Sequence, residues 1–149
     1  EFAPQSDITR AMFVTILYRM ENEPQTAAAA FIDIESGSYY EKAVAWASNN
    51  GIIFGISENQ FAPNDNITRE QMVVMIYRYA TFKGYDITTS GSTAYMDNSD
   101  ISDYAKDAVT WAAEKSIMTG NTDGSFAPKA NTTRAQAAAV FMRVLENLK

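Results

Sequence analysis

Apolar residues recur at helical spacing along four stretches of the chain. In the stretch 39–50 they stand at Tyr39, Tyr40, Ala43, Val44 and Ala47. After Thr68 they continue on one side at Met72, Val73, Ile76, Tyr79 and Ala80, and the stretches 9–21 and 133–148 repeat this second pattern. A spacing of three and four residues is typical of an amphipathic helix. Short apolar runs, turns and polar linkers separate the helices, so the sequence predicts a mainly α fold.

These helices belong to an internal repeat. Phe-Ala-Pro occurs at 2–4, 61–63 and 126–128, and a Thr-Arg pair follows each copy at 9–10, 68–69 and 133–134. All six arginines of the chain fall in this column or in a second column nine residues later, at Arg19, Arg78 and Arg143. Lysine is scattered. Because chance does not sort the two cations in this way, we interpret the columns as a true repeat.

An upstream half-repeat occurs only twice. Phe31-Ile32-Asp33 matches Tyr95-Met96-Asp97, an Ala-Val-x-Trp-Ala helix occurs at 43–47 and 108–112, and Gly-Ile-Ile-Phe-Gly at 51–55 matches 116–120. We predict one domain over 1–149, with the second half of repeat 1 at 1–22, repeat 2 at 31–83 and repeat 3 at 95–149. Linkers occupy 23–30 and 84–94, and the second is rich in Ser, Thr and Gly, as flexible linkers are.

Composition excludes several classes of site. The chain has no histidine and no cysteine, which removes thiolate and imidazole chemistry, disulfides, and zinc or haem sites built on those ligands. A net charge of −6 argues against a nucleic-acid surface. No apolar run approaches the ~18 residues of a membrane span. We therefore expect no cofactor, no metal, no nucleic-acid partner and no membrane insertion.

The repeated threonines are predicted to be helix N-caps. Thr68 with Gln71, and Thr133 with Gln136, fit the capping-box spacing, whereas Met12 leaves the box after Thr9 incomplete. The arginine that follows then stands at the first helical position, where the helix dipole makes a cation slightly unfavourable. Its recurrence there needs another cause. Either a buried carboxylate such as Asp33 or Asp97 pairs with it, or it binds an external anion together with free helix amides.

Other repeated residues carry a structural and a functional alternative. Trp46 and Trp111 are expected in the core, although tryptophan also stacks on sugar rings. Gly55 and Gly120 permit a tight loop and also the approach of a ligand to the backbone. The second arginine column lies on the opposite helix face and is interpreted as solvated or structurally paired. No paired carboxylates, nucleophile motif or phosphate-binding loop indicates catalysis.

In their order, these motifs resemble the S-layer homology repeat of bacterial cell-surface proteins. The shared elements are Phe-x-Asp, the tryptophan helix, Gly-Ile-x-x-Gly, Phe-x-Pro and Ile-Thr-Arg-Ala/Glu. The resemblance implies helix-loop-helix repeats arranged as a pseudo-threefold spindle around a central three-helix bundle, with grooves between neighbouring repeats. It also implies an extracellular location at the bacterial cell surface.

The resemblance further implies non-covalent anchoring to an anionic secondary cell wall polymer, often one ending in a pyruvate ketal. The groove arginines would be Arg10, Arg69 and Arg134, facing the ligand carboxylate. Asp33, Asp97, Gly55, Gly120, Trp46 and Trp111 occupy the other repeated positions of the family and complete the predicted ligand-binding set. The alternative is a structural or self-assembly module in which the arginines only bind internal carboxylates. An enzymatic role is not expected.

The chain departs from the family pattern at several positions, among them Ser116 in place of the glycine of Gly51 and Thr132 in place of the isoleucine of Ile67. The glutamate that closes the Thr-Arg motif is replaced by Met12, Gln71 and Gln136, so groove electrostatics are expected to differ. Repeat 1 lacks its front half: either an upstream segment or a partner chain supplies it, or one groove is incomplete. We therefore expect at most two usable grooves, and calorimetry that finds three ligands per chain would contradict this.

Overall fold

The structure, a computed structural model, describes residues 4–28, 31–92 and 94–148. Its contacts divide the chain into two compact units. One unit runs from Ile8 to Ile67, and the other combines Glu1–Asp7 with Thr68–Lys149. The described residues form five α-helices and two short 3-10 helices, and their only β-type pairings are three isolated bridges. The prediction of a mainly α chain is confirmed.

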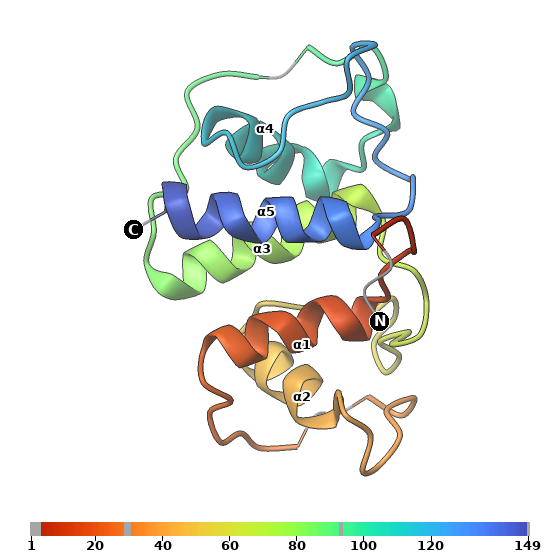
Figure 1. Cartoon of the computed structure of the whole chain (residues 1–149). Helices are drawn as coiled ribbons and strands as arrows, with labels where there is room; N and C mark the ends of the chain where they lie inside the picture. The colour runs from red at the N-terminus through yellow and green to blue at the C-terminus, as the bar shows by residue number, and fades with distance from the viewer. Residues whose placement is uncertain (1–3, 29–30, 93, 149) are drawn as a thin grey trace. The chain divides into compact units, whose positions relative to one another are not determined.

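The Ile8–Ile67 unit is built on two helices. Helix α1 (Arg10–Met20) packs against α2 (Glu41–Asn49), as Figure 1 shows. The packed faces carry the apolar residues that the helical spacing indicated, and the rings of Tyr18 and Trp46 meet with their centroids 5.6 Å apart. The loop from 51 to 67 returns from α2 to the start of α1.

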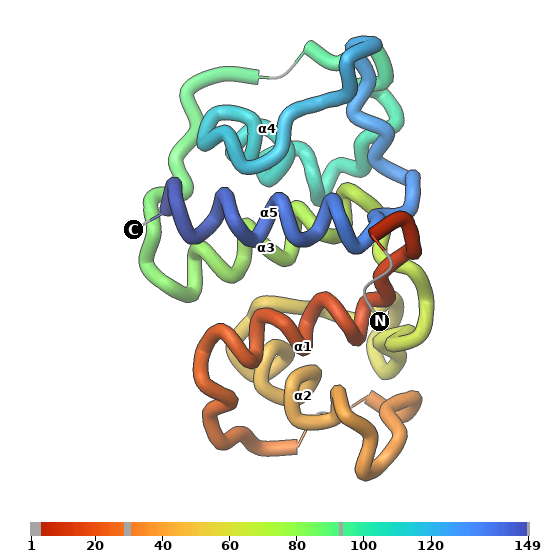
Figure 2. Tube along the Cα trace, viewed as in Figure 1, coloured from red at the N-terminus to blue at the C-terminus, as the bar shows by residue number. Residues whose placement is uncertain are grey.

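The second unit has a longer helix at its centre. Helix α3 (Arg69–Lys83) packs against α4 (Lys106–Glu114) and the short η2 (Asp103–Ala105), which follows η1 (Asn98–Asp100). Helix α5 (Arg134–Asn147) ends the unit. Figure 2 follows the chain from α4 through the loop 115–133 into α5. That loop carries the third Phe-Ala-Pro copy.

The helix starts agree with the capping prediction. Arg10, Arg69 and Arg134 are each the first helical residue, and the hydroxyl of the preceding threonine accepts a backbone N–H in all three cases. Complete capping boxes form at Thr68 and Thr133. The helix expected over 39–50 begins later, at Glu41. Tyr40 gives no side-chain cap, and the Glu41 carboxylate turns back to accept from the Gly37 amide.

An extended segment docks on the start of each long helix. The bridges pair Thr9 with Asn66, Thr68 with Asn131, and Thr133 with Asp7. Carbonyl oxygens of the docked segment accept the first two helix amides, for example Arg69 N–H to Ala130 at 2.9 Å and Glu70 N–H to Pro128 at 3.0 Å. Amides that a free helix would expose are thus satisfied by the protein itself.

Candidate functional site

Arg10 and Arg69 lie in the same kind of surrounding. The Nε–H of Arg10 donates to the carbonyl of Phe61 at 2.9 Å, and that of Arg69 to Phe126 at 2.8 Å. Each guanidinium also lies over the ring of the same phenylalanine, 4.6 Å and 5.1 Å from the centroid. We call each arginine, with its Phe-Ala-Pro loop and the aspartate that binds that loop, an arginine cradle. The two arginines are only 4% and 5% exposed.

The aspartates hold the loops of the cradles. Asp33 accepts from the amides of Phe61 and Ala62, and Asp97 from those of Phe126 and Ala127, at 2.8–3.1 Å. Both alanines have a positive φ, +60° and +57°, which is unfavourable for a residue with a side chain and more so before proline. Direct pairing of these carboxylates with the arginines was one of the two alternatives for the repeated arginine; the hydrogen bonds of Asp33 and Asp97 go instead to the backbone and stabilise a strained loop.

Electrostatics nonetheless link Asp97 to Arg69. Burial lowers the pKa of Arg69 from its usual value, while the nearby Tyr95 and Asp97 act in the opposite direction. The amide of Phe126 is the largest cause that lowers the pKa of Asp97, with burial opposing it. At neutral pH the cradle thus contains a charged guanidinium and a charged carboxylate, with the carboxylate turned to the backbone.

The two loop glycines are required by close packing. A Cβ at Gly55 would lie 2.3 Å from the carbonyl oxygen of Gln60, and one at Gly120 would lie 2.4 Å from the Tyr95 ring. Neither distance is possible for a real side chain. A tight loop with no room for a side chain therefore explains why glycine stands at both positions. Gly120 also lines the pocket described below.

The two tryptophans are buried in the core. Trp46 and Trp111 are 3% and 0% exposed and pack on Tyr18 and Tyr77. The indole N–H of Trp111 donates to the carbonyl of Asp86. Their burial confirms the expected core role. A ligand role for either tryptophan stays a prediction, and no exposed ring face supports it.

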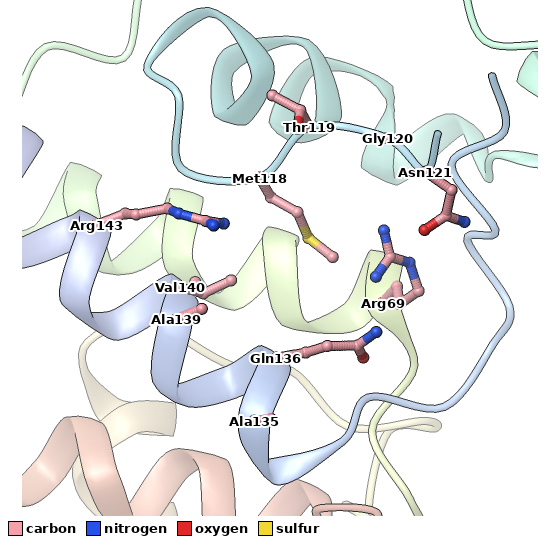
Figure 3. A pocket seen from close by; sticks show the side chains of 10 residues that line it. All are labelled: Arg69, Met118, Thr119, Gly120, Asn121, Ala135, Gln136, Ala139, Val140 and Arg143. Atoms are coloured by element: carbon pink, nitrogen blue, oxygen red, sulfur yellow. The ribbon is translucent and has the colours of Figure 1, made fainter. Parts of the chain in front are cut away.

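A pocket of about 350 Å³ opens beside Arg69. Its walls come from the start of α3, from α5 and from the loop after α4 (Figure 3). The lining residues are Arg69, Met118, Thr119, Gly120, Asn121, Ala135, Gln136, Ala139, Val140 and Arg143. We call this the Arg69 pocket. It contains two guanidinium groups and no carboxylate, although the chain as a whole is acidic.

Arg69 offers donors to this pocket. Its Nε–H is used by Phe126, but its two terminal amino groups have no hydrogen-bond partner in the described part of the chain. Figure 3 shows the guanidinium lying between Asn121 and Gln136. The expectation of free helix amides at this site is wrong, because Ala130, Pro128 and Thr68 already accept them. The first three amides of α3 are therefore already used, which leaves the guanidinium groups as the charged donors of the pocket.

Gln136 explains one departure from the family pattern. Its carboxamide oxygen accepts from the amide of Thr133 at 3.0 Å and so completes the capping box. Figure 3 shows its nitrogen on the side of Arg69. A glutamate would keep the cap but bring a second carboxylate oxygen toward the pocket. The glutamine instead presents N–H donors, which favours an anionic ligand.

Sequence reasoning missed Arg143. It assigned the second arginine column to the opposite helix face, yet Arg143 points into the pocket from α5, across Met118 from Arg69 (Figure 3). One of its amino groups donates to the carbonyl of Ile117 at 3.3 Å. Arg143 does lie on the opposite face of α5 from Arg134, but the pocket is formed by α5 together with α3. Only the repeated arginine column could have drawn attention to it.

Arg134 has a different surrounding. Its amide donates to Ser6, and the amide of Ala135 donates to Pro4, as at the other two helix starts. Its Nε–H is buried without a hydrogen-bond partner among residues 4–28, 31–92 and 94–148. The first Phe-Ala-Pro copy lies mostly outside the described residues, because these do not include 1–3. A ligand role for Arg134 stays a prediction.

Two further observations limit the chemistry. In the described ranges no group of three or more Asp or Glu side chains is placed to hold a metal ion. Within the same part of the chain, every helix is too short or too polar to cross a bilayer. The donor-rich Arg69 pocket is therefore the feature on which a function is best argued.

Comparison with known proteins agrees with the repeat pattern. The family model of the S-layer homology domain matches residues 30–73 and 97–138. Amylopullulanase of Thermoanaerobacterium thermosulfurigenes is 38% identical over 148 residues, covering 98% of this chain and 8% of that protein. Other similar proteins are named for surfaces or anchoring.

The Surface-layer 125 kDa protein of Lysinibacillus sphaericus is 27% identical, over 99% of this chain and 12% of its own length. The Cellulosome-anchoring protein of Acetivibrio thermocellus is 32% identical over 90 residues, which are 59% of this chain and 20% of that protein. The chain thus spans no more than a fifth of the length of these three relatives. The region similar to this chain therefore occurs both in an enzyme, the amylopullulanase, and in proteins named for surface layers or anchoring.

Proposed function

The chain belongs to the S-layer homology domain family, found in bacterial cell-surface proteins, and from this we propose that it anchors an exported protein to the cell wall. The proposed ligand is an anionic secondary cell wall polymer. The relatives support an anchoring role rather than a catalytic one, because an amylopullulanase and a Cellulosome-anchoring protein share this region. The activity of any larger protein that contains this chain lies outside this proposal.

One observation carries the proposed ligand class. In the Arg69 pocket, two guanidinium groups face a space without any carboxylate, and the terminal amino groups of Arg69 have no partner among the described residues. Guanidinium groups bind carboxylate and phosphate through paired hydrogen bonds. The cavity of about 350 Å³ is within the size range of small-molecule sites and accommodates a substituted sugar.

An acidic protein can bind an acidic polymer at such a place. The net charge of −6 is spread over the surface, whereas the two arginines are concentrated in a recess where water and salt screen less. Binding is therefore expected to weaken with added salt, but less than for a flat basic surface. A terminal pyruvate ketal would supply a carboxylate of the right charge and size.

The fold belongs to the same proposal. We expect the helix-loop-helix repeats to form a pseudo-threefold spindle around a central three-helix bundle, with α1, α3 and α5 as the bundle. The common docking of an extended segment on each of these helix starts supports the idea. Distances between spin labels at Arg19, Lys83 and Asn147 would test it, since a bundle requires three similar spacings.

The alternative, a structural module, also has a specific observation behind it. Arg10 and Arg69 each use Nε–H to bind a buried backbone carbonyl, so replacing either one removes an internal contact. Loss of binding in Arg69→Ala would therefore be ambiguous. A change at Arg143 distinguishes glycan binding from a structural role better, because Arg143 is exposed and makes one long hydrogen bond to Ile117.

The test is co-sedimentation with peptidoglycan sacculi that retain or lack the secondary polymer. We expect the wild-type chain to pellet only with polymer-bearing sacculi, and Arg143→Gln to pellet at least several-fold less. Arg19→Gln is the matched control, since it removes the same charge from an exposed position late in α1. Equal melting temperatures for the three proteins would show that the fold is retained.

Two results would contradict the proposal. The wild-type chain could stay in the supernatant with both kinds of sacculi, in which case this chain is not an anchor by itself. Alternatively, Arg143→Gln could pellet as well as wild type, in which case the Arg69 pocket is not the binding site.

A further inference from the structure

The two arginine cradles share one backbone scaffold. The amide of Ile32 donates to Asn59 and that of Met96 to Gly124, at 2.8 and 3.0 Å. The amides of Ile56 and Asn121 likewise donate to Gln60 and Ser125. Together with the matched arginine and aspartate contacts, these bonds place corresponding loop residues at corresponding positions. A comparison of the two loops is therefore a comparison of side chains on the same frame.

The side chains at the edge of the two cradles differ in chemistry. Thr119 and Asn121 line the Arg69 pocket. The corresponding residues beside Arg10 are Phe54 and Ile56, which are 59% and 57% exposed. Phe54 is adjacent to the cation, because its carbonyl accepts from the Arg10 guanidinium at 3.4 Å. One cradle thus has a hydrogen-bonding edge and the other an apolar, aromatic edge.

We propose that Phe54 and Thr119 give the two cradles different selectivity, with Phe54 contacting the apolar C–H face of a sugar ring whose anionic group binds Arg10. This rests on the proposed glycan binding and extends it. An exposed phenylalanine whose own backbone carbonyl binds the guanidinium suits a ligand that joins a negative charge to an apolar face. A pyranose with an acidic substituent has both features. At the Arg69 pocket, Thr119 and Asn121 would instead hydrogen-bond to sugar hydroxyls.

The inference separates charge recognition from ring recognition, so two probes test it. Sodium pyruvate supplies the carboxylate alone, and a methyl hexopyranoside that carries a pyruvate ketal supplies the carboxylate with a ring. Binding is followed at each cradle through the ¹H–¹⁵N resonances of the arginine Nε–H groups. Arg10→Lys and Arg69→Lys assign the two resonances.

The variants are Phe54→Thr and Thr119→Phe, which exchange the two edges. We expect Phe54→Thr to weaken hexoside binding at Arg10 by about three- to tenfold and to leave pyruvate binding unchanged. Thr119→Phe should strengthen hexoside binding at Arg69 by a similar factor. Phe82→Thr is the control, since it makes the same change at a partly exposed phenylalanine of α3. Melting curves confirm that each variant folds.

The outcomes distinguish this inference from the proposed function. If Phe54→Thr weakens pyruvate and hexoside equally, or changes neither, Phe54 does not select a sugar ring and the inference fails alone. If Phe82→Thr weakens hexoside binding at Arg10 as much as Phe54→Thr does, the effect is non-specific and the inference also fails. If neither probe shifts either arginine resonance in the wild-type chain, the glycan-binding proposal fails with it.

Discussion

The ammonium group of Lys129 lies 2.8 Å from Oε2 of Glu70, a side chain 59 residues earlier in the chain. Glu70 follows Arg69 in α3 and is only 2% exposed. Ser102 and Tyr104 also donate to its carboxylate. A buried carboxylate thus joins the start of α3 to η2 and to the loop that carries Phe126. At the matched positions after Arg10 and Arg134 the chain has alanine.

The Glu70 cluster is expected to make stability depend on pH. Burial would raise the pKa of Glu70, but the hydrogen bonds from Lys129, Ser102 and Tyr104 outweigh it and the pKa falls below its usual 4.5. A lowered folded pKa contributes stability above pH 4.5 that is lost as the pH falls through the folded value. Glu70→Gln should cost about 2 kcal/mol near neutral pH, and the difference from wild type should shrink in acid.

Urea unfolding of wild type and Glu70→Gln between pH 7 and pH 3 measures this difference. Glu114→Gln serves as a control for an exposed carboxylate, since Glu114 is exposed and accepts from the exposed Ser90. A Glu70→Gln difference that stays constant across the whole range would show that the Glu70 carboxylate is not the titrating group.

A serine at the end of α4 is expected to be strained. Ser116 has φ +57°, and the corresponding residue after α2 is Gly51 with φ +71°. A left-handed residue after a helix suits glycine, because a Cβ there meets the following carbonyl. Ser116→Gly should raise the free energy of unfolding by about 0.5–1 kcal/mol, and Gly51→Ser should lower it by about 1 kcal/mol. Space does not oppose Gly51→Ser, since no atom lies within 4 Å of the added Cβ.

Thermal melts of both variants measure the two shifts, which should have opposite signs. If both signs are reversed, so that Ser116→Gly destabilises and Gly51→Ser stabilises, the hydroxyl of serine rather than backbone strain decides the stability at these positions.

Two adjacent threonines should respond in opposite ways to the same change. Thr132 is fully buried, and its hydroxyl has no hydrogen-bond partner within the ranges the structure describes. Isoleucine stands at the matched positions 8 and 67. Thr132→Val removes the unpaired hydroxyl and should stabilise by about 1 kcal/mol. Thr133→Val removes the N-cap of α5 and should destabilise by about 1 kcal/mol.

The two melting temperatures, measured at the same pH, check this prediction. Destabilisation by Thr132→Val would mean that its hydroxyl is satisfied in solution by a group that the packing around it does not reveal.

The Asp97 carboxylate is expected to hold the strained Ala127 loop in place. Asp97→Asn keeps the shape but weakens acceptance from the amides of Phe126 and Ala127, and should cost about 1–2 kcal/mol. Ala127→Gly relieves the positive φ and should restore part of that loss when the two changes are combined. A double-mutant cycle by urea unfolding measures the recovery. If Ala127→Gly recovers no stability in the Asp97→Asn background, Asp97 does not act by holding a strained Ala127.

Much of the fold followed from periodicity in the sequence. The starts of α1, α3 and α5 were predicted to the residue, because the Thr-Arg repeats and the apolar spacing agree locally, and at α3 and α5 so do the capping-box glutamines. The start of α2 was missed by two residues, since Tyr39 and Tyr40 fit the apolar pattern but lack a cap. The repeat and linker ranges stay a prediction, since the two compact units, which meet between Ile67 and Thr68, group residues by contact and not by repeat.

The site was harder to predict because it depends on tertiary contacts. The importance of Arg69 was evident from its column, but the role of Asp97 was not, since sequence cannot tell a side-chain partner from a backbone one. The sequence did not draw attention to Glu70, because the other two repeats have alanine at the matched position. To predict Arg143 as a pocket residue, one has to know how α3 and α5 lie relative to the loop after α4.

Each cradle joins segments that are far apart along the chain. Arg10 binds the carbonyl of a residue 51 positions later, and Arg69 one 57 positions later. During synthesis, each arginine therefore emerges well before its partner loop exists. These contacts are also expected to form late in folding, because the chain between the two residues must lose conformational entropy before the contact is made. If the chain crosses a membrane unfolded, both cradles are absent in transit and arise only when folding finishes at the destination.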